Sequence, residues 1–305
     1  MTGLNKKKGV ALAIIAALFY SLISVCVKWI GGVLPTVEIL LFRGLVMWIV
    51  GCSTMLVQRQ KLDNRHLPLL MARGLSGAFG ALTYYAAVAS IPLAETMALV
   101  NLSPFVISVL AAIFLKEKIH RWHVIALLIS FAGALVIIRP GFSTVQVGYL
   151  IALASAFITG CSYTMVRKLK QDVDTQTIVF WYNAMTVAVA LPVTLLKGFV
   201  MPQGLVWVKL LCLGLCSLLF NYFNTASYQY ASAGEISIYT YLSIIFSSLI
   251  GIFLWKEHLV LSTVIGIVLI LAGAYCSFVA KKPTGEKAVE GTKADGAFGA
   301  KKEDP

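Results

Sequence analysis

Ten long apolar runs, separated by short polar segments, dominate the hydropathy pattern of this chain. Each run has about the 20 apolar residues that a helix needs to cross a bilayer core of about 30 Å. The pattern therefore predicts an all-α integral membrane fold with ten transmembrane helices, at residues 9–30, 35–57, 67–89, 92–115, 122–138, 147–166, 177–196, 205–230, 232–254 and 261–280.

Both ends of the chain are polar. Residues 1–8 form a short leader with three lysines, and the apolar run that follows is too long for a cleaved signal peptide. Residues 281–305 consist mainly of Lys, Glu, Asp, Gly and Ala, which cannot bury enough apolar surface to fold. We expect a cytoplasmic leader and a disordered cytoplasmic tail.

The fourth and ninth predicted helices are similar in sequence, at an offset of 140 residues. The repeat divides the chain into two five-helix copies, residues 9–140 and 147–280. Because five is odd, the second copy enters the membrane in the opposite orientation. Inverted repeats around a central site are typical of secondary transporters, which alternate between two states of similar energy. The aligned positions include Glu95 with Glu235, Ser108 with Ser248, and Lys116-Glu117 with Lys256-Glu257.

The composition supports the membrane class. Hydrophobic residues make up 59% of the chain and charged residues 12%, about half the charged share of a soluble protein. The net charge of +12 comes mostly from loops and tails, so it does not indicate a nucleic-acid partner. Fourteen Lys and Arg lie on the side of the N-terminus and five on the other, which predicts an inner-membrane protein with both termini cytoplasmic. All six cysteines lie in apolar runs, where we expect packing residues rather than disulfides.

Several short motifs follow one another in the order and spacing of a known family. They are Phe42-Arg43-Gly44, Ser103-Pro104, FLKEK at 114–118, LWKE at 254–257, and Ala-Gly-Ala triplets at 132–134 and 272–274. Together with two five-helix copies they resemble the EamA type of the drug/metabolite transporter superfamily, over residues 9–280. Residues 95–104 are similar to the branch of S-adenosylmethionine and organic-anion carriers. The resemblance implies an alternating-access carrier of a small metabolite: an amino acid, a zwitterion such as S-adenosylmethionine, or a carboxylate.

Arg43 is the most costly polar residue in the predicted helices, because it lies near the middle of the bilayer. An arginine there costs about 2.5–3.5 kcal/mol on insertion scales, so it needs a partner in protein or water. Two interpretations stay open: a docking point for a substrate carboxylate or phosphate, or a structural ion pair, for instance with Glu95. Arg73 and Lys28 lie nearer helix ends, where we expect their side chains to reach the interface.

Polar and aromatic side chains on several helices are candidates for a central substrate cavity. Ser155, Thr159 and Ser162 follow one face of the sixth predicted helix, and a similar face runs along the eighth. Amides, hydroxyls and rings suit a small organic substrate, although they also form hydrogen bonds between helices. The candidates are Tyr20, Ser24, Arg43, Tyr84, Asn101, Thr159, Asn221, Asn224, Tyr228 and Tyr239.

Two further features distinguish the copies. Glu95 and Glu235 each begin a helix, which the helix dipole explains; alternatively, each is a gate on one side of the cavity. Pro104 of the first copy is replaced by Ile244 in the second. We therefore expect helix 92–115 to kink near Asn101 and helix 232–254 to stay straighter.

The fifth and tenth predicted helices carry small residues instead of polar ones. Ala126, Ser130 and Gly133 share a face of the fifth helix, and Gly266 and Gly273 share a face of the tenth. Such faces pack against neighbouring helices or against a second subunit, in a homodimer through these two helices.

Energy coupling leaves little trace in the sequence. No Asp or Glu lies near the middle of a predicted helix, so the sequence favours uniport or exchange over proton-coupled export. It contains no P-loop, and Glu117, His120 and His123 form a basic loop rather than a metal site, so we expect no cofactor and no metal. An enzyme would need clustered acids or histidines at mid-depth. A non-transporting receptor or partner protein would explain the helices but not the repeat.

Overall fold

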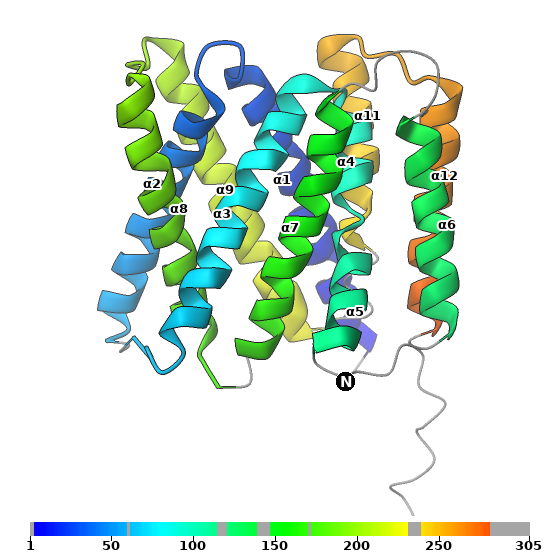
Figure 1. Ribbon diagram of the computed structural model, residues 1–305, viewed down its shortest axis with the longest axis horizontal. Helices are drawn as coiled ribbons and strands as arrows, with labels where there is room; N and C mark the ends of the chain where they lie inside the picture. Colours follow the sequence, from blue (N-terminus) through cyan, green and yellow to red (C-terminus); the bar gives the residue numbers. More distant parts are fainter. Residues whose placement is uncertain are drawn as a thin grey trace, which may run out of the picture.

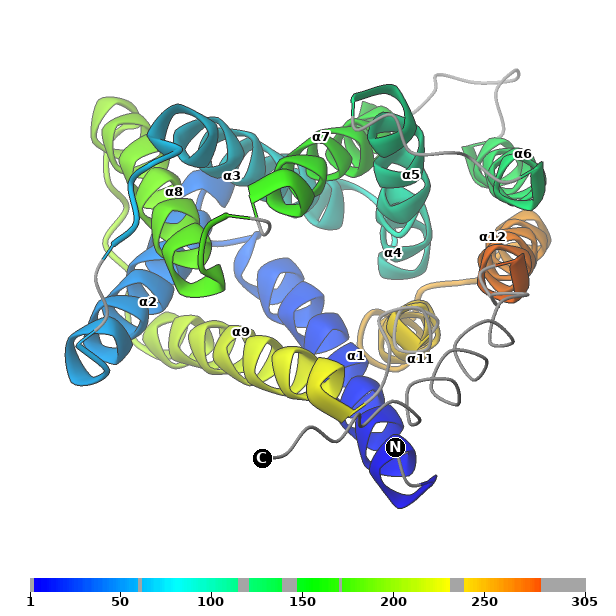
Figure 2. The same cartoon turned by 90° about the horizontal axis from the view of Figure 1, so that it is seen from below.

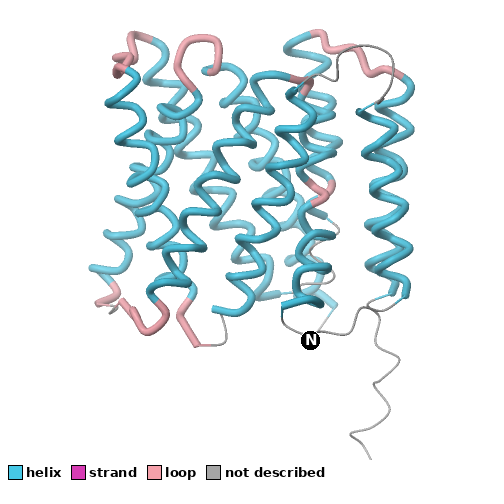
Figure 3. The backbone as a smooth tube through the Cα atoms, viewed as in Figure 1, coloured by secondary structure: helices cyan, strands magenta, loops and turns pink. Residues whose placement is uncertain are grey.

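The computed structural model describes residues 3–59, 62–114, 121–138, 147–169, 172–230 and 239–280. Over these ranges the chain forms helices and no strand (Figures 1 and 3), as the hydropathy pattern predicts. The helices are α1 (Gly3–Ile30), α2 (Thr36–Val57), α3 (Leu67–Ser90), α4 (Leu93–Val100), α5 (Ser103–Phe114), α6 (Arg121–Ile138), α7 (Val147–Leu169), α8 (Thr175–Lys197), α9 (Leu205–Tyr230), α11 (Leu242–Trp255) and α12 (Leu261–Ala280).

The described surface is suited to lipid. Large apolar side chains point outward along the bundle, among them Leu128, Phe131 and Val268, which are more than half exposed. Such a surface aggregates in water but matches the hydrocarbon of a bilayer. Within the described ranges, six segments are long and apolar enough to cross a membrane: Lys7–Ile30, Thr36–Val57, Leu93–Phe114, Val147–Leu169, Thr175–Lys197 and Leu205–Ser227.

Local sequence signals set several helix ends. Asp174 caps α8, because its carboxylate accepts a hydrogen bond from the Gln176 N–H at 3.0 Å. α8 ends at Gly198, whose φ of +88° suits glycine. Pro35 and Pro92 directly precede α2 and α4, where the missing N–H costs no helical hydrogen bond.

The kink predicted near Asn101 is a full interruption between α4 and α5. Asn101 Nδ2 donates to the Met97 carbonyl oxygen at 2.7 Å, and the Asn101 backbone N–H donates to the same oxygen at 3.1 Å, so this carbonyl near the end of α4 has two donors. Pro104 is the second residue of α5, a position where proline fits a helix start. The asparagine therefore stabilises the end of one helix and the proline the beginning of the next.

The expectation of a straighter second copy is wrong. Tyr241, 140 residues after Asn101, separates the helical residues 239–240 from α11. Ile244 stands at the proline position there, so the interruption does not depend on a proline. Asn101 Nδ2 also lies 3.4 Å from Ser243 Oγ, which places the two interruptions against one another.

The helices of the two copies pack in exchanged pairs (Figure 2). α1, the first helix of one copy, packs on α9, the third helix of the other. α3 and α7 form the corresponding pair with the copies exchanged. The second helices, α2 and α8, pack on each other, and so do the last helices, α6 and α12. If a two-fold axis relates the copies, the contact of α1 with α9 implies a matching contact of α7 with α3, which is the pattern seen here.

Glycines bring α6 and α12 into backbone contact. A Cβ atom on Gly133 would lie 2.7 Å from the Gly266 carbonyl oxygen, and one on Gly273 would collide with Ser130 Oγ. The small-residue faces are thus the seam between neighbouring helices of one chain. A second subunit would have to use other faces of α6 and α12, and the homodimer stays a prediction.

Candidate functional site

Arg43 is directed into the bundle from α2. Its Nε donates a hydrogen bond to Ser217 Oγ on α9 at 3.1 Å, and its guanidinium carbon lies 6.0 Å from the centre of the Tyr85 ring on α3. The side chain is only half-buried although three helices surround it. A cation in this position is held by neutral hydroxyl and aromatic groups.

Arg73 is buried, with 8% of its surface exposed, which corrects the expectation that it reaches the interface. Its Nη1 donates to Ser162 Oγ on α7 at 2.8 Å. The cause is the glycine one position later: a Cβ on Gly74 would lie 2.9 Å from the Trp181 carbonyl oxygen. Without that Cβ, α8 packs closely over α3 and covers the arginine. Lys28, also expected at the interface, pairs with Glu257.

Tyr182 on α8 contacts both arginines. The Arg73 guanidinium carbon lies 4.5 Å from the centre of the Tyr182 ring, well within cation–π range. Tyr182 is also a close electrostatic neighbour of the Arg43 guanidinium. We call Arg43, Arg73, Tyr85 and Tyr182 the arginine cluster. Its members come from α2, α3 and α8, so both copies contribute.

The charges of the arginine cluster are uncompensated within the described residues. Neither Arg43 nor Arg73 takes part in an ion pair there. Nearby buried polar atoms also lack hydrogen-bond partners, which costs about 1–3 kcal/mol for each group. These atoms are Arg73 Nε, Tyr85 Oη and Asn183 Nδ2. The arrangement is suited to a ligand that brings negative charge and hydrogen-bond acceptors.

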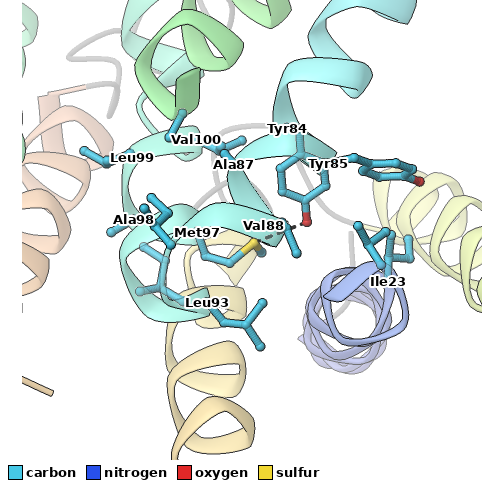
Figure 4. Packing of buried hydrophobic residues seen from close by; sticks show 14 of the residues in the cluster. Ile23, Tyr84, Tyr85, Ala87, Val88, Leu93, Met97, Ala98, Leu99 and Val100 are labelled. Carbon is cyan, nitrogen blue, oxygen red and sulfur yellow. Dashed lines mark hydrogen bonds between the residues drawn. The ribbon is translucent and has the colours of Figure 1, made fainter. Parts of the chain in front are cut away.

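Three of the predicted cavity residues, Tyr20, Ser24 and Tyr84, contact one another. Tyr84 and Ser24 share a hydrogen bond of 2.6 Å, and the Tyr84 hydroxyl also lies 3.5 Å from Met97 Sδ. Figure 4 shows Tyr84 pointing toward Met97, whereas the next residue, Tyr85, points away from it. Tyr20 stacks on the Tyr84 ring at 6.0 Å. Tyr84 and Ser24 are buried, so they position α3, while half-buried Tyr20 stays a candidate for substrate contact.

Other predicted residues hydrogen-bond or pack against neighbouring helices. Asn101 joins the two helix interruptions. Thr159 faces α3, where a Cβ on Gly80 would lie 2.8 Å from its Oγ1, so this part of the predicted polar face is a helix contact. Asn221 Nδ2 donates to the Ser217 carbonyl oxygen at 2.8 Å on the same helix. A substrate role for any of them stays a prediction.

The remaining candidates are only partly described. Asn224 is half-buried on α9, and Tyr239 packs against Ala13 of α1. The Tyr228 side chain and the gate candidate Glu235 lie outside the described residues.

Glu95, the other gate candidate, links the two copies. It is buried and accepts hydrogen bonds from the Tyr149 hydroxyl on α7 and from Thr263 Oγ1 on α12, the latter at 2.5 Å. The ion pair with Arg43 considered from the sequence is therefore not formed. A second acid, Glu257, pairs with Lys28 and accepts from the Leu93 N–H at 3.0 Å. The contacts of Glu95 and those of Glu257 lie in the same region, where α3 ends and α4 begins.

Tyr182, Tyr85 and Ser217 are absent from the residues selected on the sequence. The repeat contains a signal for the first of them. Tyr182 and Asn183 stand 140 residues after Phe42 and Arg43, so they occupy the equivalent helix turn of the second copy. Tyr85 and Ser217 carry no such signal, because a tyrosine or serine in an apolar run is common at helix contacts.

Comparison with known proteins agrees with this architecture. The EamA-like transporter family matches residues 7–139 and, separately, residues 146–279. The pseudopaline exporter CntI of Pseudomonas aeruginosa is 32% identical over 278 residues, 90% of this chain and 98% of that protein. A riboflavin transporter of Rhizobium johnstonii is 29% identical over 189 residues, 61% of each chain. Solute carrier family 35 member G1 of Mus musculus is 26% identical over 260 residues, 78% of this chain and 69% of that protein.

A known crystal structure also supports the fold, with a TM-score of 0.65 at 20% identity over 90% of this chain and 97% of the other. Two matches to one family along the chain account for the sequence repeat. The chain therefore belongs to the EamA-like transporter family and is an integral membrane transporter of a small molecule.

Proposed function

We propose that this chain carries a small organic anion, bearing one or more carboxylates, across the membrane by alternating access. The observation that carries the proposal is the arginine cluster, in which two guanidinium groups converge on Tyr182 without a carboxylate partner among the described residues. A buried charge without a counter-ion is strongly unfavourable. A substrate carboxylate would supply that counter-ion, with strong charge-assisted hydrogen bonds to the guanidinium groups.

The two arginines approach Tyr182 from opposite ends of the bundle. At 1.5 Å per residue, Arg43 lies about 10 Å from the start of α2 and Arg73 about 9 Å from the start of α3. α2 and α3 begin at opposite ends (Figure 1). An anion that enters from the end where α3 begins would meet Arg73 before Arg43, and Tyr182 lies in contact with both.

Alternating access is supported by the relation between the copies. Five crossings per copy and the exchanged helix pairs are consistent with an inverted repeat, which gives two states of similar energy. The cross-copy contacts of Glu95 and Glu257 lie at one end only. In our account they break when that end opens.

The relatives support the direction and the kind of substrate. One is named as an exporter of pseudopaline and another as a transporter of riboflavin, so organic metabolites are cargo of similar chains. We infer export from an inner membrane, with both termini cytoplasmic, as the basic loops predict. Uniport or exchange follows from the lack of an acid near the middle of the predicted helices.

Proton-coupled export is the second candidate. The observation that favours it is burial of two carboxyl groups, Glu38 and Glu95, inside a membrane protein. Glu38 also has an oxygen, Oε2, without a hydrogen-bond partner in the described residues. A carrier coupled through either acid would move substrate faster when a proton gradient is imposed, whereas a uniporter or exchanger would not.

Flux through purified protein in liposomes tests the proposal. We expect saturable counterflow of at least one carboxylate, and a loss of about tenfold or more in Arg43→Gln and in Arg73→Gln, because each removes a charge-assisted hydrogen bond. Neutral nucleosides serve as comparison solutes. No saturable flux of any anion, or full activity in both variants, would overturn the proposal.

Arg65→Gln is the matched control. Arg65 is an exposed arginine in the loop before α3, and its guanidinium beside Asp63 holds the pKa of that carboxyl at about 2. Its charge is already balanced by this partner, so we expect flux to equal that of the unmodified chain.

A further inference from the structure

Three cysteines from two helices gather where α1 packs on α9. Cys26 lies on α1, and Cys212 and Cys216 lie one turn apart on α9. All three are free thiols, and their Sγ atoms lie within 4.8 Å of one another. The Sγ atoms of Cys26 and Cys212 are 3.8 Å apart. Packing alone, which the sequence suggested for these residues, does not require three thiols to meet at one point.

We propose that this thiol cluster is a binding site for a soft metal ion, of the class of Cu(I), Zn(II) or Cd(II). Metal–sulfur bonds of about 2.3 Å to one shared ion place the sulfur atoms about 3.8–4.0 Å apart. The Cys26–Cys212 separation already has this value. The widest separation needs to shrink by less than about 1 Å, which small side-chain rotations provide. Sulfur ligands without nitrogen or oxygen select soft ions over Mg²⁺ or Ca²⁺.

The surroundings allow an ion to enter and to stay. Cys26 and Cys216 are buried, whereas Cys212 is exposed beside Leu211 and Leu215 on the side that faces lipid. Cys26 lies four residues before the end of α1 at Ile30, so an ion would reach the cluster from the aqueous side at that end of the bundle. Each metal–sulfur bond replaces an S–H bond, so binding releases up to three protons to water.

The site joins the two copies. α1 belongs to the first copy and α9 to the second, so a bound ion would cross-link them. This has a consequence for transport that rests on the proposed function: the ion would hold one state of an alternating-access cycle. Binding itself does not depend on that function, and the experiment below measures binding alone.

Equilibrium dialysis of the purified full chain with cadmium(II), and separately with silver(I) as a stable substitute for Cu(I), tests the site. A reductant without thiols keeps the cysteines reduced. We expect one ion of at least one metal per chain, together with an ultraviolet sulfur-to-metal charge-transfer band for cadmium. In Cys212→Ser, which changes an exposed residue and so leaves the packing intact, affinity should fall by about tenfold or more. Cys26→Ser and Cys216→Ser should give the same loss.

The chain provides its own control in the other three cysteines. The triple variant Cys52→Ser, Cys161→Ser and Cys276→Ser removes as many thiols without touching the cluster, and it should bind one ion with unchanged affinity. Two results would overturn the proposal: neither metal binds the unmodified chain at one per chain, or binding persists unchanged in Cys26→Ser, Cys212→Ser and Cys216→Ser. Both results concern metal binding alone, so neither decides the outcome of the transport experiment.

Discussion

Arg43 and Arg73 differ from Lys28 and Arg65 in what they touch. Lys28 and Arg65 each contact a carboxylate, whereas Arg43 and Arg73 contact serine hydroxyls and tyrosine rings. Hydroxyls and rings stabilise a guanidinium group without neutralising it. In the proposed function, this pair stays available to a transient anionic partner because it forms no permanent ion pair within the described residues.

Tyr182 should hold these two charges in place. Tyr182→Phe removes a polar hydroxyl in the neighbourhood of Arg43 but keeps the ring that faces Arg73, and we expect KM to rise by about tenfold, since losing a polar neighbour of a charged group costs about 1–3 kcal/mol. Tyr182→Leu removes both contacts and should lose transport almost completely. Initial rates of flux in liposomes over a range of substrate concentrations measure the two effects.

Tyr222→Leu is the control for these substitutions. Tyr222 lies on α9 with 67% of its surface exposed, so Tyr222→Leu makes the same change of side chain outside the site. Flux of Tyr182→Leu equal to that of Tyr222→Leu would exclude Tyr182 from substrate handling.

The interrupted helices owe their shape to polar groups more than to proline. Asn101→Ala removes the side-chain hydrogen bond to the Met97 carbonyl and the contact with Ser243, and it should lower stability by about 1–2 kcal/mol, because two buried side-chain interactions at the interruption are lost while only the backbone N–H still donates to that carbonyl. Pro104→Ala should cost less, about 0.4–1 kcal/mol, since it only releases backbone freedom in the unfolded chain. Thermal unfolding in detergent compares them, and a larger loss in Pro104→Ala would show that the proline makes the interruption.

The seam between α6 and α12 leaves no room for a side chain. In Gly133→Val the new Cβ would meet the Gly266 carbonyl oxygen at 2.7 Å, and we expect a loss of about 1–3 kcal/mol from overpacking. Gly51→Val is the matched control in α2, because nothing lies within 4 Å of a Cβ there. Equal midpoints of thermal unfolding for the two variants would refute the close contact.

Much of the architecture could be predicted because the membrane limits the choices. Any segment in hydrocarbon must satisfy its own backbone, so apolar runs of sufficient length become helices. The 140-residue repeat then predicts two copies of one unit, and the match of the family to residues 7–139 and 146–279 confirms two copies. The proline difference misled the comparison of the copies, because it has no bearing on the interruption at Tyr241.

The site was predictable only in part, since depth in a helix does not say what packs over a residue. Arg43 was identified by its cost in the bilayer. Arg73 was misplaced because its burial depends on how closely α8 approaches Gly74, a contact between segments far apart in sequence. Serines and tyrosines look alike at helix contacts and at binding sites. The thiol cluster, like the burial of Arg73, depends on a contact between segments far apart in sequence, because Cys26 lies far from Cys212.

The central claim is that Arg43 and Arg73 together receive an organic anion, and ligand binding tests it most directly. Thermal unfolding of the purified chain should be measured with a series of carboxylates and with their uncharged amides. Saturation at about 100 times Kd stabilises a protein by about 2.7 kcal/mol. We predict that at least one carboxylate raises the midpoint, that its amide does not, and that Arg43→Gln and Arg73→Gln lose the shift while Arg65→Gln keeps it. Stabilisation by the amide as strong as by the acid, or an undiminished shift in both Arg43→Gln and Arg73→Gln, would contradict the account.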